Sequence, residues 1–305
     1  MSKLIAIVGP NASGKSTFGL ELAKIVNAEI ISADSRQIYR GFDLCSGKIT
    51  PEEMKTVPHH LIDIRDIGEP FSVFDYQKAA YSIIPQILHR NKVPFIVGGT
   101  GLYVHSVIDG YVLREEAADC ELRGKLEELC KEELQSMLTP EGKAFLAKNP
   151  SDYSNKRRII RVIIKTALGE PLEYENAARY DALRLGVKWP KEKLQERISA
   201  RLELRIKQGM IDEVKTYLDN GGKQEYLYNL GLEYRYILWY LTGKFRSLDE
   251  FKRETEQAIK HFAKRQLTWF RRDAKIHWID MDVDYTARVH SLVSEFLEDG
   301  GKFGS

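Results

Sequence analysis

A glycine-rich stretch near the N-terminus carries the clearest chemical signal in the sequence. Residues 9–16 read Gly-Pro-Asn-Ala-Ser-Gly-Lys-Ser and fit the pattern G-x-x-x-x-G-K-[ST], in which backbone N–H groups cradle phosphate oxygens. In such loops the lysine neutralises terminal phosphate oxygens and the last hydroxyl binds Mg²⁺. The pattern alone does not say which phosphate compound is bound. The predicted phosphate-binding residues are Gly9, Pro10, Asn11, Ala12, Ser13, Gly14, Lys15 and Ser16, with Ser16 as the metal ligand.

The stretches that flank this loop predict the elements that must position it. Leu4–Val8 is a short apolar run with the β-branched content of a buried strand. After the loop, apolar residues recur at helical spacing at Phe18, Leu22, Ile25 and Val26. The order strand, loop, helix aims backbone N–H groups and a helix N-terminus at an anion.

A second predicted strand, Glu29–Asp34, ends in a carboxylate. In open parallel sheets this end of a strand faces the ligand crevice, so Asp34 and the following Ser35-Arg36-Gln37 are expected near the phosphate loop. Three interpretations of Asp34 remain open at this stage. It is a general base, an outer-sphere Mg²⁺ ligand or the cap of a helix.

A short strand is predicted over Pro58–Ile64, and the next predicted strand, Val93–Val97, ends in Gly98-Gly99-Thr100-Gly101. In nucleotide-hydrolysing proteins with this loop, such a strand often ends in an Asp that helps to hold Mg²⁺. Glycines instead let backbone approach a ligand closely, and Thr100 can donate a hydrogen bond to an oxyanion or cap the next helix.

The pattern changes between residues 114 and 190, where strand signals disappear and charged amphipathic segments at 115–137, 140–148 and 155–168 predict a helical insertion. In the last of these, Arg158, Arg161 and Lys165 share a face opposite a row of isoleucines. That face suits a phosphate backbone, and it equally suits solvent.

Three arginines recur at a spacing of four within a predicted helix over Leu194–Leu218. Such a row of Arg197, Arg201 and Arg205 is self-repelling, and either a bound anion or nearby glutamates would relieve it. Basic and aromatic residues alternate again over 264–272, which suits RNA or a helix that packs its aromatic side on a core. The adjacent His59 and His60 are interpreted as a structural pair, because no third metal ligand follows at a recognisable spacing.

Composition bounds these interpretations. Of 305 residues, 46 are Lys or Arg and 44 are Asp or Glu, so net charge gives no argument for nucleic acid. No apolar run approaches a membrane span, no signal peptide is recognised, and three cysteines without metal spacing indicate reduced thiols in the cytoplasm. We predict an α/β fold: a P-loop parallel-sheet core with helices on both faces (residues 1–113 and 191–298) and a helical insertion domain (114–190).

Taken together, these stretches resemble the tRNA dimethylallyltransferase family, also called tRNA isopentenyltransferase. The combination of Asp34-Ser35-x-Gln37-x-Tyr39 with Gly98-Gly99-Thr100-Gly101-Leu102-Tyr103 is specific to it. The chain departs from the family pattern at Leu44–Ile49 and at Gly231–Arg235. The matching stretches run in family order over nearly the whole chain, at Gly9–Ser16, Ile31–Arg40, Val57–Asp63, Val97–Tyr103, Asn155–Arg161 and Ala263–Arg271.

The resemblance implies a reaction and its participants. A monomer would transfer a dimethylallyl group from dimethylallyl diphosphate to N6 of adenine 37 in tRNA, with Mg²⁺ as cofactor, and the insertion would clamp the anticodon stem. Asp34 would be the general base, Thr100 would bind near the bridging oxygen, and Arg201, together with Arg197, would complete the diphosphate clamp. The implied tRNA-binding residues are Asp34, Ser35, Arg36, Gln37, Thr100, Arg123, Arg157, Arg158, Arg161 and Arg235.

Three other functions compete with this one. A P-loop nucleotide kinase would consume ATP and need no RNA, and the glycines after Val97 argue against it. An adenylate isopentenyltransferase would use free nucleotide, whereas the insertion and the basic stretch at 264–272 favour tRNA. An RNA-binding protein with a merely structural loop is disfavoured by the intact Lys15 and Ser16.

Overall fold

The computed structural model describes residues 1–113, 120–148, 150–173 and 175–298, so the predicted tail at 299–305 and the start of the segment at 115–137 lie outside the described residues. The chain divides into two compact units. Unit 1 comprises Met1–Asp109 and Ala178–Ser305, and unit 2 comprises Gly110–Ala177. Among the described residues, no helix has the length and apolar character needed to cross a membrane.

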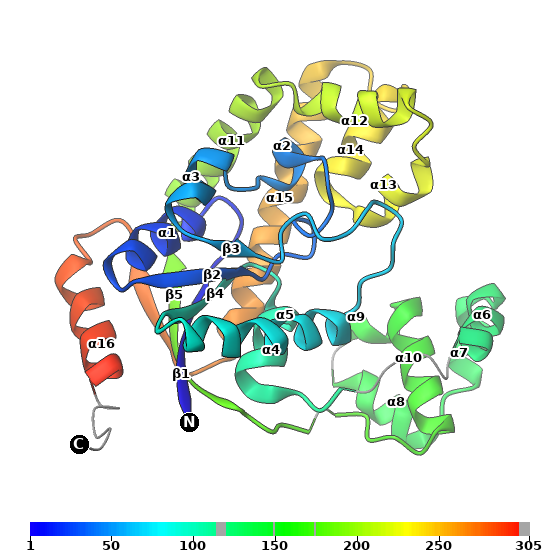
Figure 1. The fold of residues 1–305 in the computed structure, drawn as a ribbon. Helices are drawn as coiled ribbons and strands as arrows, with labels where there is room; N and C mark the ends of the chain where they lie inside the picture. The colour runs from blue at the N-terminus through cyan, green and yellow to red at the C-terminus, as the bar shows by residue number, and fades with distance from the viewer. Residues whose placement is uncertain (114–119, 149, 174, 299–305) are drawn as a thin grey trace. The chain divides into compact units, whose positions relative to one another are not determined.

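Unit 1 is built on a six-stranded parallel sheet with the strand order β3-β2-β4-β1-β5-β6 (Figure 1). Successive residues of the central strand β1 point to opposite faces: Leu4 and Val8 enter one apolar cluster, Ile5 and Ile7 the other. The strands are β1 (Ser2–Val8), β2 (Ala28–Ser32), β3 (His59–His60), β4 (Val93–Gly98), β5 (Tyr180–Lys188) and β6 (Ile276–Asp280).

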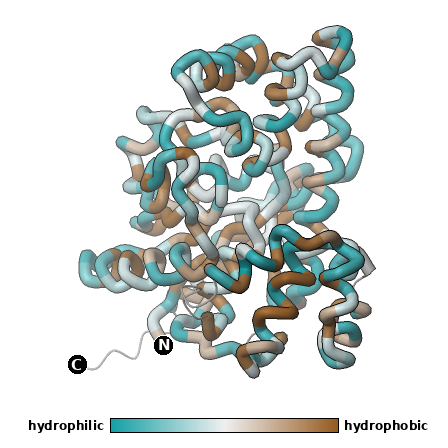
Figure 2. Tube along the Cα trace, turned by 90° about the vertical axis from the view of Figure 1, so that its right-hand side faces the viewer, coloured by the Kyte–Doolittle hydropathy of each residue, from teal (hydrophilic) through white to brown (hydrophobic). Residues whose placement is uncertain are grey.

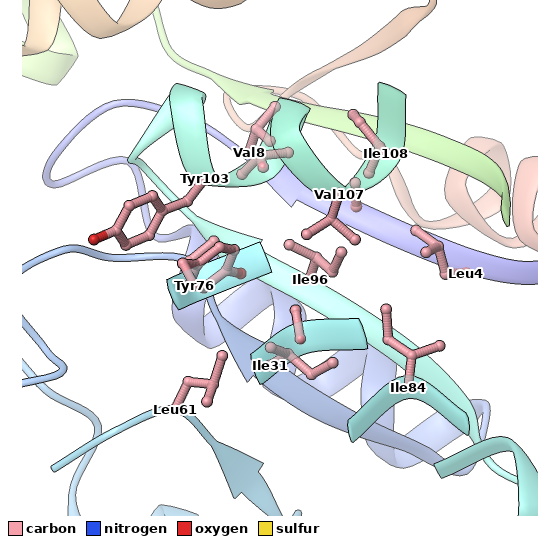
Figure 3. Packing of buried hydrophobic residues seen from close by; sticks show 14 of the residues in the cluster. Leu4, Val8, Ile31, Leu61, Tyr76, Ile84, Ile96, Tyr103, Val107 and Ile108 are labelled. Atoms are coloured by element: carbon pink, nitrogen blue, oxygen red, sulfur yellow. The ribbon is translucent and has the colours of Figure 1, made fainter. Parts of the chain in front are cut away.

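Helices cover both faces of this sheet, which confirms the predicted fold class. On one face lie α1 (Lys15–Ile25) and α16 (Thr286–Glu298), while α4 (Val73–His89), α5 (Gly101–His105) and the π-helical turn η1 (Ser106–Gly110) lie on the other. Figure 3 shows Tyr76 and Ile84 of α4 packed with Ile31 and Ile96 from the sheet. α1 ends at Ile25, which is exposed rather than part of its apolar stripe.

The other helices of unit 1, apart from the short helix Pro51–Thr56, which buries no residue, form a third apolar cluster beyond the carboxyl edge of the sheet. They show teal and brown residues in alternation, as amphipathic helices do (Figure 2). We predicted one helix over Leu194–Leu218, and this was wrong. Gly209 adopts a left-handed φ of +99° and ends the first helix, so the segment forms two. These helices are α2 (Asp43–Ser46), α3 (Pro51–Thr56), α11 (Lys191–Lys207), α12 (Met210–Asp219), α13 (Gln224–Leu230), α14 (Leu232–Leu241) and α15 (Leu248–Phe270).

Strand β5 overturns the prediction that residues 114–190 contain no strand. It pairs with the whole length of β1, so residues 178–190 belong to unit 1 and not to the insertion. The charged Arg184 in its middle hid the strand from a search for apolar runs. Its guanidinium is buried because it is neutralised by Asp109 (2.7 Å) and Asp273 (2.6 Å), which are remote in sequence.

Unit 2 is a small helical body with an apolar core of its own. Leu126, Leu134 and Leu146 pack there against the buried isoleucines of α10. Asn155 caps α10 by accepting hydrogen bonds from the backbone N–H groups of Arg157 and Arg158. The helices are α6 (Cys120–Glu128), α7 (Lys131–Ser136), α8 (Pro140–Ala147), α9 (Pro150–Tyr153) and α10 (Lys156–Ala167).

A buried carboxylate joins three elements at one edge of the sheet. Glu29 of β2 is 3% exposed and contacts Arg90 (2.7 Å), His60 (2.7 Å) and Lys92 (3.2 Å). The histidine pair is therefore structural at His60, and no group of three potential metal ligands occurs in the described part of the chain. Burial alone would raise the pKa of Glu29, but hydrogen bonds from Arg90, His60 and Lys92 outweigh it and lower the pKa to about 2.

We expect Glu29→Gln to destabilise the fold by about 2 kcal/mol at neutral pH. Because the pKa of Glu29 falls from 4.5 to about 2 on folding, its charge stabilises the fold above pH 4.5, and this stabilisation is lost as pH falls through 2. Urea unfolding at several pH values should show that the free energy of unfolding of the variant decreases less, as pH falls from 4.5 to 2, than that of the wild type. The control Glu196→Gln, at an exposed position, should leave the curve unchanged; identical curves for wild type and Glu29→Gln would contradict the assignment.

Candidate active site

The carboxyl ends of three neighbouring strands place the predicted site residues together. β4 lies between β1 and β2, so the turns that follow these strands are adjacent. The turn after β4 approaches the backbone of Ala33 so closely that a Cβ on Gly98 would lie 2.1 Å from the Ala33 oxygen. The same oxygen accepts a hydrogen bond from the Thr100 N–H (3.1 Å). These contacts fix the position of Asp34, the next residue in the chain.

The phosphate loop has the backbone that its sequence predicts. Gly14 has a φ of +85° and precedes α1, whose first N–H groups have no partner within the helix. The loop is held from outside by Trp189, whose Nε1 donates to the Ser13 oxygen (2.8 Å), and by Arg197, whose Nε donates to the Ala12 oxygen (2.9 Å). The start of α1 is thus a rigid site for an anion.

A cavity of about 680 Å³ opens in front of this helix start. Asp34 of the β2 turn lines it together with Lys15 and Ser16, and Leu44, Ile49 and Leu204 add apolar surface. Ten of the predicted diphosphate- or tRNA-binding residues are among its lining residues: Asn11, Ala12, Gly14, Lys15, Ser16, Asp34, Arg36, Gln37, Arg197 and Arg201.

Other predicted residues of unit 1 do not line the cavity. The Oγ1 of Thr100 accepts a hydrogen bond from the Ser35 N–H (3.0 Å) and donates to the Ser35 Oγ (3.3 Å). Arg235 donates to the Tyr228 oxygen and stacks over the Tyr228 ring at 4.3 Å. The predicted residues of unit 1 outside the lining are Gly9, Pro10, Ser13, Ser35, Thr100 and Arg235.

Positive charge is concentrated at one end of the cavity. Burial lowers the pKa of Lys15 to about 8; Asp34 opposes this shift, and Arg201 and Arg205 add to it. Burial likewise lowers the pKa of Arg201 to about 10, with repulsion from Arg205 contributing. Within the described part of the chain, Arg201 has no hydrogen-bond or ion-pair partner. Of the two explanations for the arginine row, the geometry therefore favours a bound anion.

The predicted basic residues of unit 2 lie on α6 and at the start of α10. Arg157 and Arg158 are exposed, Arg161 and Arg123 are half-buried, and Arg158 forms an ion pair with Asp152. The isoleucines opposite them are buried, as the amphipathic pattern predicted.

Gln266 of α15 is a site residue that the sequence did not reveal. Its Oε1 accepts a hydrogen bond from the Asn11 N–H (2.8 Å), and its Nε2 donates to the Gly99 oxygen (2.9 Å). It thereby joins the phosphate loop to the turn after β4. In the same stretch Phe270 is fully buried and Trp269 packs against Gly101, so the aromatic residues of 264–272 serve the core. In the sequence, Gln266 is only an uncharged polar residue that follows Lys264 and Arg265, and nothing there indicates that it is buried.

We expect Gln266→Leu, which keeps the volume of the side chain, to destabilise unit 1 by about 2–4 kcal/mol, because the buried Gly99 carbonyl and the half-buried Asn11 N–H lose their partners. The loosened loop should also bind inorganic pyrophosphate more weakly. Chemical unfolding and calorimetric titration measure the two effects. Gln257→Leu, on the exposed side of the same helix, is the matched control; unchanged pyrophosphate affinity in Gln266→Leu would show that this residue does not organise the loop.

Comparison with known proteins places this geometry in a family. The model of IPP transferase matches residues 37–273. The tRNA dimethylallyltransferase of Carboxydothermus hydrogenoformans is 42% identical over an alignment of 287 residues that covers 91% of this chain and 92% of that protein. The tRNA dimethylallyltransferase of Halalkalibacterium halodurans is 38% identical over 320 residues, covering 98% and 99%.

Solved structures agree with the sequence matches. The crystal structure of the full-length tRNA isopentenylpyrophosphate transferase from Bacillus halodurans superposes with a TM-score of 0.75 at 36% identity, covering 99% of both chains. A eukaryotic dimethylallyltransferase acting on tRNA shares the fold with a TM-score of 0.82 at 22% identity, covering 98% of this chain and 80% of that one. With its phosphate loop, its parallel sheet and these relatives along nearly its whole length, the chain belongs to the IPP transferase family.

Proposed function

We propose that this protein transfers a dimethylallyl group from dimethylallyl diphosphate to N6 of adenine 37 in tRNA and releases diphosphate. The observation that carries the proposal is one cavity lined by Lys15, Arg201 and Asp34, which offers an anion seat beside a carboxylate. Several relatives bear the name tRNA dimethylallyltransferase. That name supports tRNA as the acceptor, and the protein is proposed to act on it in the cytoplasm.

The donor has a charged diphosphate and an apolar hydrocarbon chain, and the cavity has both cationic and apolar lining residues. Breaking the allylic C–O bond leaves negative charge on the diphosphate, and Lys15, Arg201 and the N–H groups at the start of α1 would stabilise it. The apolar surface of Leu44, Ile49 and Leu204 suits a five-carbon hydrocarbon chain. No water needs to be activated, which agrees with the absence of an acid at the Gly98-Gly99-Thr100 end of β4 in the described structure.

Mg²⁺ is the proposed cofactor, and the donor set accommodates it. Ser16 lines the cavity, and its hydroxyl has no hydrogen-bond partner in the described part of the chain. Because Mg²⁺ keeps several waters and takes substrate phosphate oxygens as ligands, one hydroxyl suffices from the protein. The ion would neutralise charge on the diphosphate.

Asp34 is the proposed general base. The N6 amine of adenine is a weak nucleophile, and loss of its proton must accompany formation of the C–N bond. Asp34 lines the cavity beside the diphosphate seat, and its Oδ1 is held by the N–H of Arg36 at 3.0 Å. An adenine stacked in the anticodon loop must be flipped out to reach it.

We propose that the RNA is held by Ser35, Arg36, Gln37, Thr100 and Arg235 of unit 1, and that unit 2 clamps the anticodon stem. Arg157 and Arg158 are exposed residues whose charge suits phosphates, and Arg123 and Arg161 belong to the same proposed surface. The proposed working form is a monomer.

We expect Asp34→Asn to slow transfer by about 10²- to 10⁴-fold while donor binding survives, because asparagine can still accept the hydrogen bond from Arg36 but cannot take up a proton. An anticodon stem-loop with adenine 37, dimethylallyl diphosphate and Mg²⁺ are incubated with each protein, and the product mass is followed. A stem-loop with guanine at this position is the control. Transfer by Asp34→Asn at the wild-type rate, or loss of γ-phosphate from labelled ATP by the wild type, would contradict the proposal.

A further inference from the structure

Glu233 is a buried carboxylate on the cavity wall that the proposed reaction does not use. The residue is 3% exposed. Its Oε1 lies 4.0 Å from Nη1 of Arg205, and its Oε2 lies 3.8 Å from Nη1 of Arg36. Among the described residues, Oε2 has no hydrogen-bond partner. Both ion pairs are at the outer limit of contact, so the carboxylate is buried with cations nearby but no tight bond to either.

Gly47 leaves the space that the guanidinium group of Arg205 occupies at the cavity, because glycine has no side chain. A Cβ on Gly47 would lie 1.4 Å from Nη2 of Arg205 and 2.2 Å from Nη2 of Arg201. The two guanidinium groups therefore lie side by side against this glycine, whose φ of +63° is also unfavourable for other residues. Both arginines line the cavity together with Lys15.

This arrangement leaves charge for a ligand to balance. The cationic side chains that line the cavity outnumber the acidic ones by six to four: Lys15, Arg36, Lys48, Arg197, Arg201 and Arg205 against Asp34, Asp43, Glu53 and Glu233. An arginine forms stronger, bidentate hydrogen bonds with phosphate oxygens than it forms with a carboxylate at 4.0 Å.

We propose that Arg205 is a second diphosphate-binding guanidinium beside Arg201, and that Glu233 is its positioning residue. Glu233 is the counter-ion of Arg205 before the donor binds. When the donor binds, the Arg205 guanidinium forms its hydrogen bonds with the diphosphate instead, and it pairs with Glu233 again after diphosphate is released. This inference rests on the proposed function, which makes diphosphate the leaving group, and it adds a residue pair to that site.

Binding of inorganic pyrophosphate with Mg²⁺, measured by calorimetry, tests the role of Arg205. Arg205→Met alone would leave the buried carboxylate of Glu233 without this counter-ion. The variant is therefore the double substitution Arg205→Met with Glu233→Gln. We expect it to bind pyrophosphate about 10- to 100-fold more weakly than wild type. Arg205→Lys, which retains the charge but not the bidentate geometry, should lose several-fold. Thermal unfolding checks that each variant is folded.

Glu233→Gln alone tests the counter-ion role. It removes the competitor for Arg205, so pyrophosphate should bind about tenfold more tightly and turnover should become limited by diphosphate release. A merely structural glutamate would not give tighter binding. The matched control is Glu203→Gln on the same helix as Arg205, since Glu203 pairs with Lys252 (2.9 Å) outside the cavity. It should leave affinity unchanged.

Lys15→Ala separates this inference from the proposed function. If Lys15→Ala abolishes pyrophosphate binding while the double variant binds like wild type, Arg205 is not a diphosphate ligand and the inference is overturned, whereas the diphosphate site stands. If Glu233→Gln weakens binding, the counter-ion role is overturned. If Lys15→Ala itself binds pyrophosphate like wild type, the proposed function fails.

Discussion

The cavity brings Lys15, Arg201 and Arg205 together, and the cationic side chains that line it outnumber the acidic ones. This excess of positive charge is the constraint that the rest of the structure must support. Burial of an ammonium or guanidinium group disfavours its charged form, and neighbouring cations repel it. Burial first, and this repulsion second, therefore lower the pKa values of Lys15 and Arg201. Such an arrangement is tolerated because the surrounding scaffold is rigid. The close approach of Gly98 to Ala33 and the bridge made by Gln266 supply that rigidity. The site is thus poised for a ligand with several negative charges.

The two units place their cationic side chains in different surroundings. Unit 1 concentrates charge in a cavity whose wall includes the buried Lys15 and Glu233, and burial strengthens each interaction with a small anion. Unit 2 carries exposed arginines on α10, the arrangement that suits a large, salt-screened polyanion. A small anion and a long polyanion therefore make different demands on burial, and the two units build their charged surfaces on separate cores.

The sequence revealed the features whose signal is local. The phosphate loop, the strand before it and the position of Asp34 follow from patterns within a few residues, and the structure places them together. Strand β5 escaped because Arg184 is neutralised by carboxylates far along the chain. Gln266 escaped because its two partners are backbone groups more than 150 residues away. Tertiary partners of this kind leave no periodic pattern to find.

The place of β5 in the chain has a consequence for synthesis on the ribosome. β1 is the first strand made, yet one of its two edges is covered only by Tyr180–Lys188. Until those residues emerge, an apolar strand edge of the nascent chain stays open, and such edges are where aggregation begins. Unit 2 has its own core and is complete by Ala177. The insertion can therefore fold first, before β5 closes the sheet by a slow, long-range pairing.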